Sequence, residues 1–133
     1  MSFRSVLILE NDPADLLVAT SVVEVLGIDH IHAFATLAGS QTFLESGLRG
    51  ERALPDAMII DLDLGHESGF ELLRFWRMNP PLESIPVIVW TALGAAHYRE
   101  MCEVFRVHRF LGKWEGQAAL RDCLISFAEA VAP

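Results

Sequence analysis

Short apolar runs alternate along the whole chain with segments of helical periodicity. Five runs bounded by polar or glycine-containing turns predict buried strands, at residues 6–9, 28–34, 58–60, 86–90 and 109–111. Apolar residues spaced three or four positions apart predict helices at residues 13–26, 36–48, 95–107 and 115–131, and a further helix from residue 68 or 69 to the run Asn79-Pro80-Pro81. Such alternation is typical of βαβ units with right-handed crossovers. We therefore expect an α/β fold, a doubly wound five-stranded parallel sheet with five helices in a three-layer sandwich.

Residues that favour helix ends flank several of these segments. Asp12 is a good N-cap, and Pro13 suits the first turn of the helix that follows it. Thr36 is the candidate cap of the second helix, and Gly27 is placed to end the first. These signals support the helix positions predicted from the apolar spacing.

Length and composition favour one domain. The chain has 133 residues, 52% of them hydrophobic, and a mean hydropathy of +0.34, which suits a small sheet buried on both faces. We expect a single domain over residues 1–133, with no output domain after the last helix. No apolar run is long enough to span a bilayer, and the N-terminus does not resemble a signal peptide, so we expect a cytoplasmic protein without membrane contact.

Charge, cysteine and histidine content narrow the function further. The net charge of −8 argues against direct nucleic-acid binding through a basic face. Cys102 and Cys123 have no metal or redox spacing, so we expect free buried thiols in a reducing compartment. The five histidines are scattered, and none has a carboxylate or cysteine at ligand spacing, so a histidine metal site is not expected.

Polar side chains that can carry chemistry follow four of the five predicted strands. Asp61 follows the apolar run 57–60, where a carboxylate can coordinate a hard cation or attack phosphorus. The carboxyl ends of parallel strands share one edge of the sheet, so groups distant in sequence can converge there. The other groups at these ends are Glu10, Asn11 and Asp12 after the first strand, Thr91 after the fourth and Lys113 after the fifth.

Taken singly, each of these residues is equally consistent with a helix cap or a solvated surface position. Taken together they form a coherent site. Carboxylates can hold Mg²⁺, and Asp61 can accept a phosphoryl group as an acyl phosphate. Mg²⁺ and the Lys113 ammonium can neutralise the phosphoryl oxygens, and the Thr91 hydroxyl can donate a hydrogen bond to one of them.

The sequence resembles the receiver domains of two-component response regulators over nearly its whole length. The motifs that carry the resemblance are VLILENDP at 6–13, IDLDL at 60–64 with Gly69, PVIVWTA at 86–92 and FLGK at 110–113. The resemblance implies a flavodoxin-like fold with strand order 2-1-3-4-5, the order of chemotaxis regulators.

The resemblance also implies roles for individual residues. Asp61 would be the phosphoacceptor, Thr91 and Lys113 would contact the phosphoryl oxygens, and Phe110 would be an aromatic switch that rotates inward on activation. The donor would be a phosphohistidine on a sensor histidine kinase or a histidine phosphotransfer protein. The output surface for a downstream protein would be formed by the fourth helix, fifth strand and fifth helix, and a homodimer stays open as an alternative.

A magnesium site is implied at the same edge of the sheet. Glu10 and Asn11 would occupy the position of the acidic pair that holds Mg²⁺, together with Asp61. Asp63 would offer its backbone carbonyl to the metal. Asp12 is a further carboxylate that could compensate for the neutral side chain of Asn11.

Three positions depart from the family pattern. Asn11 stands where the family usually carries the metal-ligating Asp, so we expect weaker metal affinity unless a neighbouring carboxylate compensates. Gly65 replaces a common Pro, which predicts a looser loop. Trp114 stands where a cis-Pro commonly follows the lysine, and a cis bond to a non-proline residue costs about 2.5–4 kcal/mol. Either Lys113–Trp114 is cis or the loop is rerouted.

Two other functions remain as alternatives. The first is a degenerate receiver that acts as a phosphorylation-independent adaptor. The second is a phosphatase of the haloacid-dehalogenase type, because Asp61-Leu62-Asp63 has the form of its Asp-x-Asp pair. That enzyme class needs another acidic pair after the lysine, whereas Glu115, Asp122 and Glu129 fall in a predicted helix. We therefore favour the phosphoacceptor over both, and do not expect an enzyme with a separate substrate.

Overall fold

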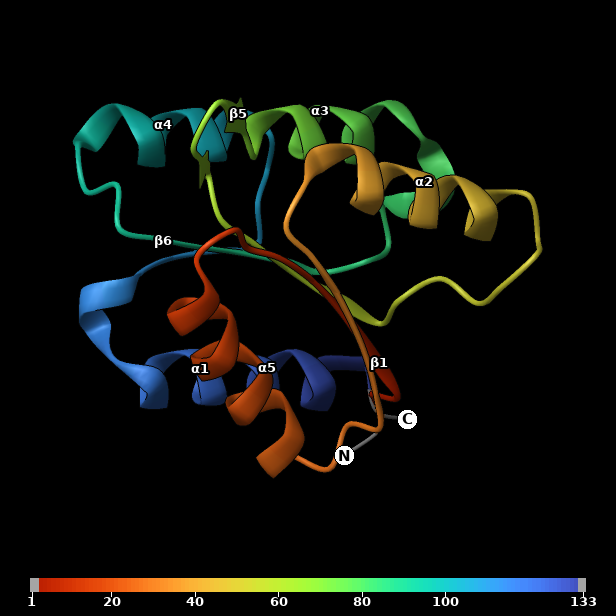
Figure 1. Ribbon diagram of the computed structural model, residues 1–133, viewed down its shortest axis with the longest axis horizontal. Coiled ribbons are helices and arrows are strands. Elements are labelled where there is room, and N and C mark those ends of the chain that lie inside the picture. Colours follow the sequence, from red (N-terminus) through yellow and green to blue (C-terminus); the bar gives the residue numbers. More distant parts are fainter. Residues whose placement is uncertain (1–2, 132–133) are drawn as a thin grey trace.

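The computed structural model describes residues 3–131, and in this range a five-stranded parallel sheet lies between two layers of helices (Figure 1). Neighbouring strands pair in the order β2-β1-β3-β6-β7. Their bounds are β1 (Ser5–Leu9), β2 (His30–Phe34), β3 (Ala57–Ile60), β6 (Val87–Thr91) and β7 (Arg109–Gly112). Counted along these five strands the order is 2-1-3-4-5, which confirms the predicted doubly wound topology. Residues 1, 2, 132 and 133 of the predicted domain lie outside the described range.

The helices divide between the two faces of the sheet. Figure 1 shows α1 (Pro13–Val25) and α5 (Gln117–Val131) below the sheet, and α2 (Leu37–Leu48), α3 (Phe70–Met78) and α4 (Ala96–Val104) above it. Because all five strands run parallel, the loops that follow β1, β3, β6 and β7 lie at one edge of the sheet.

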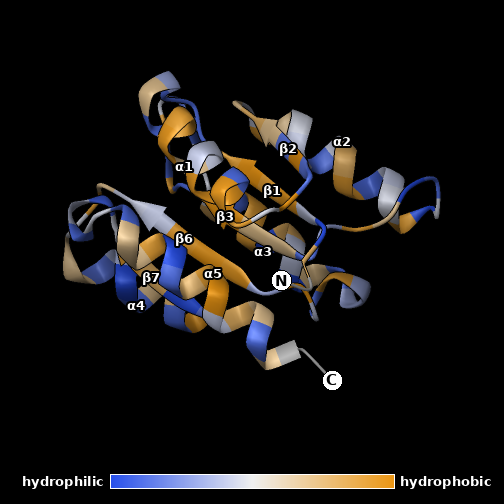
Figure 2. Ribbon diagram, turned by 90° about the horizontal axis from the view of Figure 1, so that it is seen from below, coloured by the Kyte–Doolittle hydropathy of each residue, from blue (hydrophilic) through white to orange (hydrophobic). Residues whose placement is uncertain are grey.

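Side chains of β1 alternate between the two cores. Val6 and Ile8 pack in the core under α1 and α5, whereas Leu7 and Leu9 pack in the core under α2 and α3. Successive strand side chains point to opposite faces, so a strand covered on both sides must be apolar at every position. Figure 2 shows β1 and β3 as hydrophobic segments in the centre, with hydrophilic positions concentrated in the surrounding helices and loops.

Three predicted boundaries were wrong by two or three residues, and each has a local cause. The second strand begins at His30 rather than residue 28, because Gly27 (φ 80°) makes a turn after α1. The last helix begins at Gln117 rather than residue 115, because a short 3-10 helix, η2 (Lys113–Glu115), and Gly116 (φ 93°) come first.

The fourth helix ends at Val104 rather than residue 107. Arg106 adopts φ 58°, which stops the helix. Arg77 of α3 fixes this end by donating to the carbonyl oxygens of Phe105 at 2.5 Å and of Arg106 at 2.7 Å. A helix end held by a distant side chain leaves no signal in the local apolar pattern.

A short hairpin that was not predicted follows Asp61. It consists of β4 (Asp63–Leu64) and β5 (Glu67–Ser68), with Gly65 at φ 77° in the turn. Gly69 then leads into α3, and a Cβ there would overlap the carbonyl oxygen of Asp61. A further 3-10 helix, η1 (Pro80–Leu82), follows α3.

Smaller predictions are confirmed. The side chain of Asp12 accepts a hydrogen bond from Asp15 N at 2.9 Å, and that of Thr36 accepts one from Gly39 N at 3.2 Å, so both are N-caps. Cys102 and Cys123 are free and buried.

Over residues 3–131, none of the helices has both the length and the apolar character needed to cross a bilayer.

Candidate functional site

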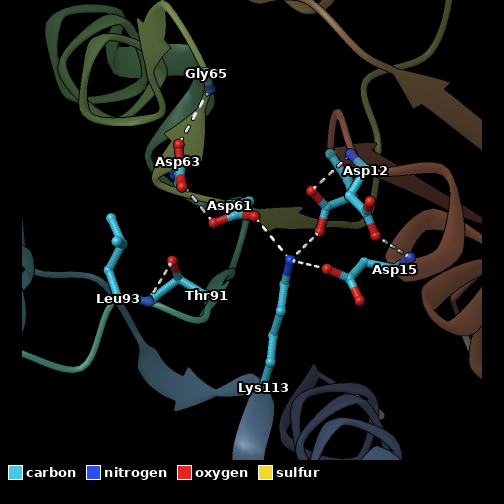
Figure 3. A network of polar contacts seen from close by, with 9 residues as sticks. Asp12, Asp15, Asp61, Asp63, Gly65, Thr91, Leu93 and Lys113 are labelled. Atoms are coloured by element: carbon cyan, nitrogen blue, oxygen red, sulfur yellow. Dashed lines mark hydrogen bonds and ion pairs between the residues drawn. The ribbon is translucent and has the colours of Figure 1, made fainter.

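Lys113 brings three strand ends together. Its amine lies at the carboxyl end of β7 and donates to Glu10 Oε1 at 2.5 Å, Asp15 Oδ2 at 2.6 Å and Asp61 Oδ2 at 2.8 Å (Figure 3). Glu10 follows β1 and Asp61 follows β3, so the contacts join residues 103 and 52 positions apart in sequence. The convergence predicted for the two carboxylates and the lysine is therefore observed. We call Glu10, Asp15, Asp61 and Lys113 the lysine site.

Asp61 is held from several directions. Its side chain is only 5% exposed, and its backbone N donates to Leu9 O at 3.0 Å, which continues the pairing of β3 with β1. One carboxylate oxygen accepts from Lys113, and the other accepts from Asp63 N at 3.0 Å. The close approach of Gly69 to the Asp61 carbonyl fixes the backbone beneath it. The orientation of this carboxylate is thus set by both main chain and side chains.

Glu10 is the most deeply buried carboxylate of the lysine site. Its side chain is 1% exposed, and Oε2 accepts from Asp12 N at 3.3 Å. Burial raises the pKa of Glu10 to about 7, and the neighbouring charge of Asp61 adds to the increase, although the hydrogen bond from Lys113 opposes it. This carboxylate therefore binds a proton more tightly than an exposed glutamate does.

Lys113 is the positive centre of the site. Burial lowers its pKa, but the hydrogen bonds to Asp15, Asp61 and Glu10 outweigh burial, so the pKa is raised and the amine stays charged. With all four groups ionised, three carboxylates surround one ammonium, and the lysine site carries a formal charge of −2. The amine also lies 5.1 Å from the ring centroid of the buried Trp90, within cation–π range.

The loop after Lys113 is rerouted rather than cis. None of the peptide bonds between residues 3 and 131 is cis, so Lys113–Trp114 is trans. The Trp114 ring is 61% exposed and lies over Gly112, where a Cβ would overlap it. It also approaches Gly94 in the loop after β6, where a Cβ would lie 3.3 Å away. Trp114 thus packs between the backbone beside Lys113 and the loop that follows Thr91.

Thr91 is the last residue of β6, and Phe110 lies within β7, the strand in which the sequence placed it. Thr91 is fully buried, and its hydroxyl oxygen accepts from Leu93 N at 3.3 Å (Figure 3). Phe110 is partly buried in the core under α4, and the Arg99 guanidinium lies 4.6 Å from its ring centroid. The side chains of Thr91 and Phe110 are not among the hydrogen-bond partners of Lys113, and their switch roles stay predictions.

Asp12 and Asp63 use their side chains locally. The Asp12 carboxylate caps α1, and Asp63 Oδ1 accepts from Gly65 N at 3.1 Å (Figure 3). Asn11 is exposed and faces the β4–β5 turn, where a Cβ on Gly65 would lie 3.4 Å from its Nδ2. The five predicted metal residues therefore surround the same edge of the sheet without converging on one point.

The donor atoms at this edge suit a hard divalent cation. Carboxylates of Glu10 and Asp61, the amide oxygen of Asn11 and the backbone carbonyl of Asp63 are all oxygen ligands. Within residues 3–131, however, no three His, Cys, Asp or Glu side chains are already arranged to hold a metal ion. The Lys113 amine instead bridges Glu10 and Asp61. The chemistry of the donors thus fits the cation, and the assignment of ligands stays a prediction.

The sequence reasoning missed Asp15. This residue lies in the first turn of α1, where an acidic side chain is usually explained by the helix dipole. Its contact with Lys113 spans 98 residues and depends on how α1 is turned against the sheet. The only local indication that Asp15 belongs to the site is its carboxylate in the first turn of α1, shortly after Glu10 and Asp12.

Comparisons with known proteins agree with this architecture. No protein-family model matches the sequence. The chain is 24% identical over 114 residues to chemotaxis protein CheV1 of Helicobacter pylori, covering 84% of this chain and 34% of CheV1. It is 42% identical over 50 residues to the phosphate regulon transcriptional regulatory protein PhoB of Rhizobium meliloti, covering 38% of this chain and 22% of PhoB. The chain thus spans about a third and about a fifth of the length of these relatives.

Solved structures give the clearest match. The phosphorylated cyanobacterial phytochrome response regulator RcpA superposes with a TM-score of 0.80 at 18% identity, covering 96% of this chain and 93% of that one. The chain has the receiver fold of response regulators. The Mn²⁺-bound form of response regulator Rcp1 shares this receiver fold with a TM-score of 0.76 at 24% identity, covering 90% of this chain and 88% of that one.

Proposed function

We propose that this protein is a phosphoacceptor signalling domain in which Asp61 takes a phosphoryl group from a phosphohistidine. The observation that carries the proposal is the contact of the Lys113 amine with Asp61 and Glu10 at the carboxyl ends of three strands. A buried carboxylate with a fixed ammonium beside it is the arrangement that phosphoryl transfer to Asp requires. The phosphorylated state of RcpA supports the same chemistry in a protein of this fold.

The transfer forms one bond and breaks one. A carboxylate oxygen of Asp61 attacks phosphorus, a P–O bond forms, and the P–N bond of the donor breaks. The leaving imidazole nitrogen keeps the electron pair and takes a proton from solvent. The Lys113 ammonium neutralises charge on the phosphoryl oxygens, and the Thr91 hydroxyl donates to one of them once the loop after β6 has moved.

A divalent cation belongs to this mechanism. Glu10, Asn11, Asp61 and the Asp63 carbonyl would hold it, and we propose Mg²⁺ because all these ligands are oxygens. When bound, it supplies positive charge to the phosphoryl oxygens. The Mn²⁺-bound form of Rcp1 supports a divalent cation in this fold.

The signal would leave through the face formed by α4, β7 and α5. Phosphorylation adds about −1.5 to −2 charges at Asp61. Thr91 and Lys113 then shift toward the new group, and the Phe110 ring on β7 follows. A partner that binds the shifted state better stabilises it, since a modification moves a two-state equilibrium only by its differential effect on the two states.

A mass measurement tests the proposal. Incubation with a small acyl phosphate and Mg²⁺ should add one phosphoryl group to the wild-type chain, and Asp61→Asn should abolish the gain. Beryllofluoride, which mimics a phosphoryl group on Asp, should shift NMR signals on the α4–β7–α5 face. No mass gain with any small acyl phosphate or phosphohistidine donor, together with no beryllofluoride shift, would contradict it.

One observation favours a second candidate, an adaptor that signals without phosphorylation. Asn11 removes a formal charge from the metal region, and Lys113 already has three carboxylate partners. An adaptor would bind its partner equally well as wild type and as Asp61→Asn. A phosphatase would instead hydrolyse generic phosphate esters with turnover, which we do not expect.

A further inference from the structure

Asp15 is the one member of the lysine site that faces solvent. Its side chain is 36% exposed, whereas those of Glu10 and Asp61 are 1% and 5% exposed. A lysine ammonium has three N–H donors, and these three carboxylates take one each. Asp15 therefore completes the hydrogen bonding of Lys113 from the outer side of the site.

The position of Asp15 is fixed by the helix that carries it. Its backbone N donates to the Asp12 side chain, which caps α1. Because Asp12 already caps the helix, the Asp15 carboxylate is available for Lys113, 2.6 Å away. A purely local role in the helix dipole would not require this contact across 98 residues.

The negative charge of Asp15 explains what its contact with Lys113 can do for the site. Asn11 is neutral, so with Glu10 and Asp61 ionised, as they would be when they hold a cation, these two groups and Lys113 carry a formal charge of only −1. Asp15 brings the site to −2, which matches the charge of a divalent cation. It also leaves the ammonium a partner when the oxygens of Asp61 are taken by another group.

We propose that Asp15 is a positioning residue of this site: its carboxylate holds the Lys113 amine while a divalent cation or a phosphoryl group engages Asp61, and it supplies the negative charge that Asn11 lacks. The inference rests on the proposed function and extends it to a residue of α1. Asp15 acts through Lys113 and is not itself a ligand of the cation.

The first test is a Mn²⁺ titration of the full chain, followed by water-proton relaxation. Asp15→Asn keeps the shape of the side chain and removes its charge, so the uncompensated Lys113 ammonium should compete with the cation for Glu10 and Asp61. We expect Mn²⁺ affinity to fall about tenfold, as the loss of an outer partner of a metal site does. Glu24→Gln, an exposed charge change at the far end of α1, is the matched control and should leave the affinity unchanged.

A rescue variant separates charge from shape. Asn11→Asp added to Asp15→Asn returns one formal charge to the strand end and should restore most of the lost affinity. Equal affinities for wild type, Asp15→Asn and Glu24→Gln would overturn the inference. Failure of the double variant to regain affinity would also overturn it, because the charge of Asp15 would then not be what Asn11 lacks.

The second test needs no metal. Lys113 is the only lysine in the sequence, so selective ¹⁵N-lysine labelling gives a single side-chain amine signal. Its protons should exchange with water several-fold faster in Asp15→Ala than in wild type or Glu24→Gln. Unchanged exchange would show that Asp15 does not hold the amine.

The two proposals can fail separately. If the wild type accepts no phosphoryl group but Mn²⁺ affinity and amine exchange both depend on Asp15, the proposed function falls and the role of Asp15 stands. If Asp61 is phosphorylated and Asp15 variants match the control in both tests, only the role of Asp15 is overturned.

Discussion

Replacing Glu10 with glutamine tests the electrostatics of the site through the stability of the fold. Glu10 is almost fully buried beside Asp61, and burial, together with the charge of Asp61, raises its pKa from 4.5 to about 7. Glutamine has nearly the same shape, and its amide oxygen can still accept the hydrogen bond from Lys113. Its NH2 group cannot accept from Asp12 N as Glu10 Oε2 does, and this lost hydrogen bond lowers the stability of the variant by the same amount at every pH. The titrating charge is therefore read from the pH dependence of the difference between the two proteins.

The size and sign of the effect follow from that pKa. A folded-state pKa of about 7 instead of 4.5 corresponds to about 3 kcal/mol. Because the pKa is raised, the folded state binds this proton more tightly, and the stabilisation is present below pH 4.5 and lost as the pH rises through 7. The wild-type free energy of unfolding should therefore fall over this range through Glu10, whereas the glutamine variant has no such contribution. The advantage of Glu10→Gln over wild type should grow by about 3 kcal/mol between about pH 4.5 and about pH 8.

Urea unfolding followed by tryptophan fluorescence measures this difference. A chelator keeps divalent cations away from the carboxylates, and Glu24→Gln controls for the loss of one exposed charge. Comparing the variants at each pH cancels the titration of other groups. If the difference in unfolding free energy between Glu10→Gln and wild type stayed constant from low to high pH, the pKa of Glu10 would not be raised in the folded state.

Three further substitutions or reactions probe the packing. Gly112→Ala would drive a methyl group into the Trp114 ring and should lower the free energy of unfolding by about 1–3 kcal/mol. In a double-mutant cycle, adding Trp114→Ala should restore most of that stability, and strictly additive effects would contradict the contact. Gly69→Ala overlaps backbone rather than a side chain, so it should cost at least about 2 kcal/mol in urea unfolding and no second substitution nearby should relieve it. Burial raises the pKa of Cys102 and of Cys123 to about 11, and both residues are 2% exposed. A thiol reagent at pH 8 should therefore label them only as fast as the chain unfolds. Rapid labelling of the folded chain would show that the thiols are accessible.

The sequence by itself determined the sheet and the edge at which the site lies. Strands covered on both faces must be apolar at every position, so β1, β3 and β6 stand out as continuous apolar runs. Polar groups that directly follow such runs must lie at the carboxyl edge of a parallel sheet. The positions of Glu10, Asp61 and Lys113 could therefore be predicted without knowing any distance between them.

Only the tertiary structure decided how the side chains at this edge share their partners. Asp15 reaches Lys113 because of the rotation of α1 against the sheet, and the apolar spacing of a helix does not fix that rotation to within one side chain. The Trp114 ring lies over Gly112 and beside Gly94, which follows a different strand, and no local pattern around residue 114 indicates this packing. The hydrophobic pattern can be read from each segment alone. Which charged side chains neutralise one another depends on which segments meet, and the segments meet only when the two cores have packed.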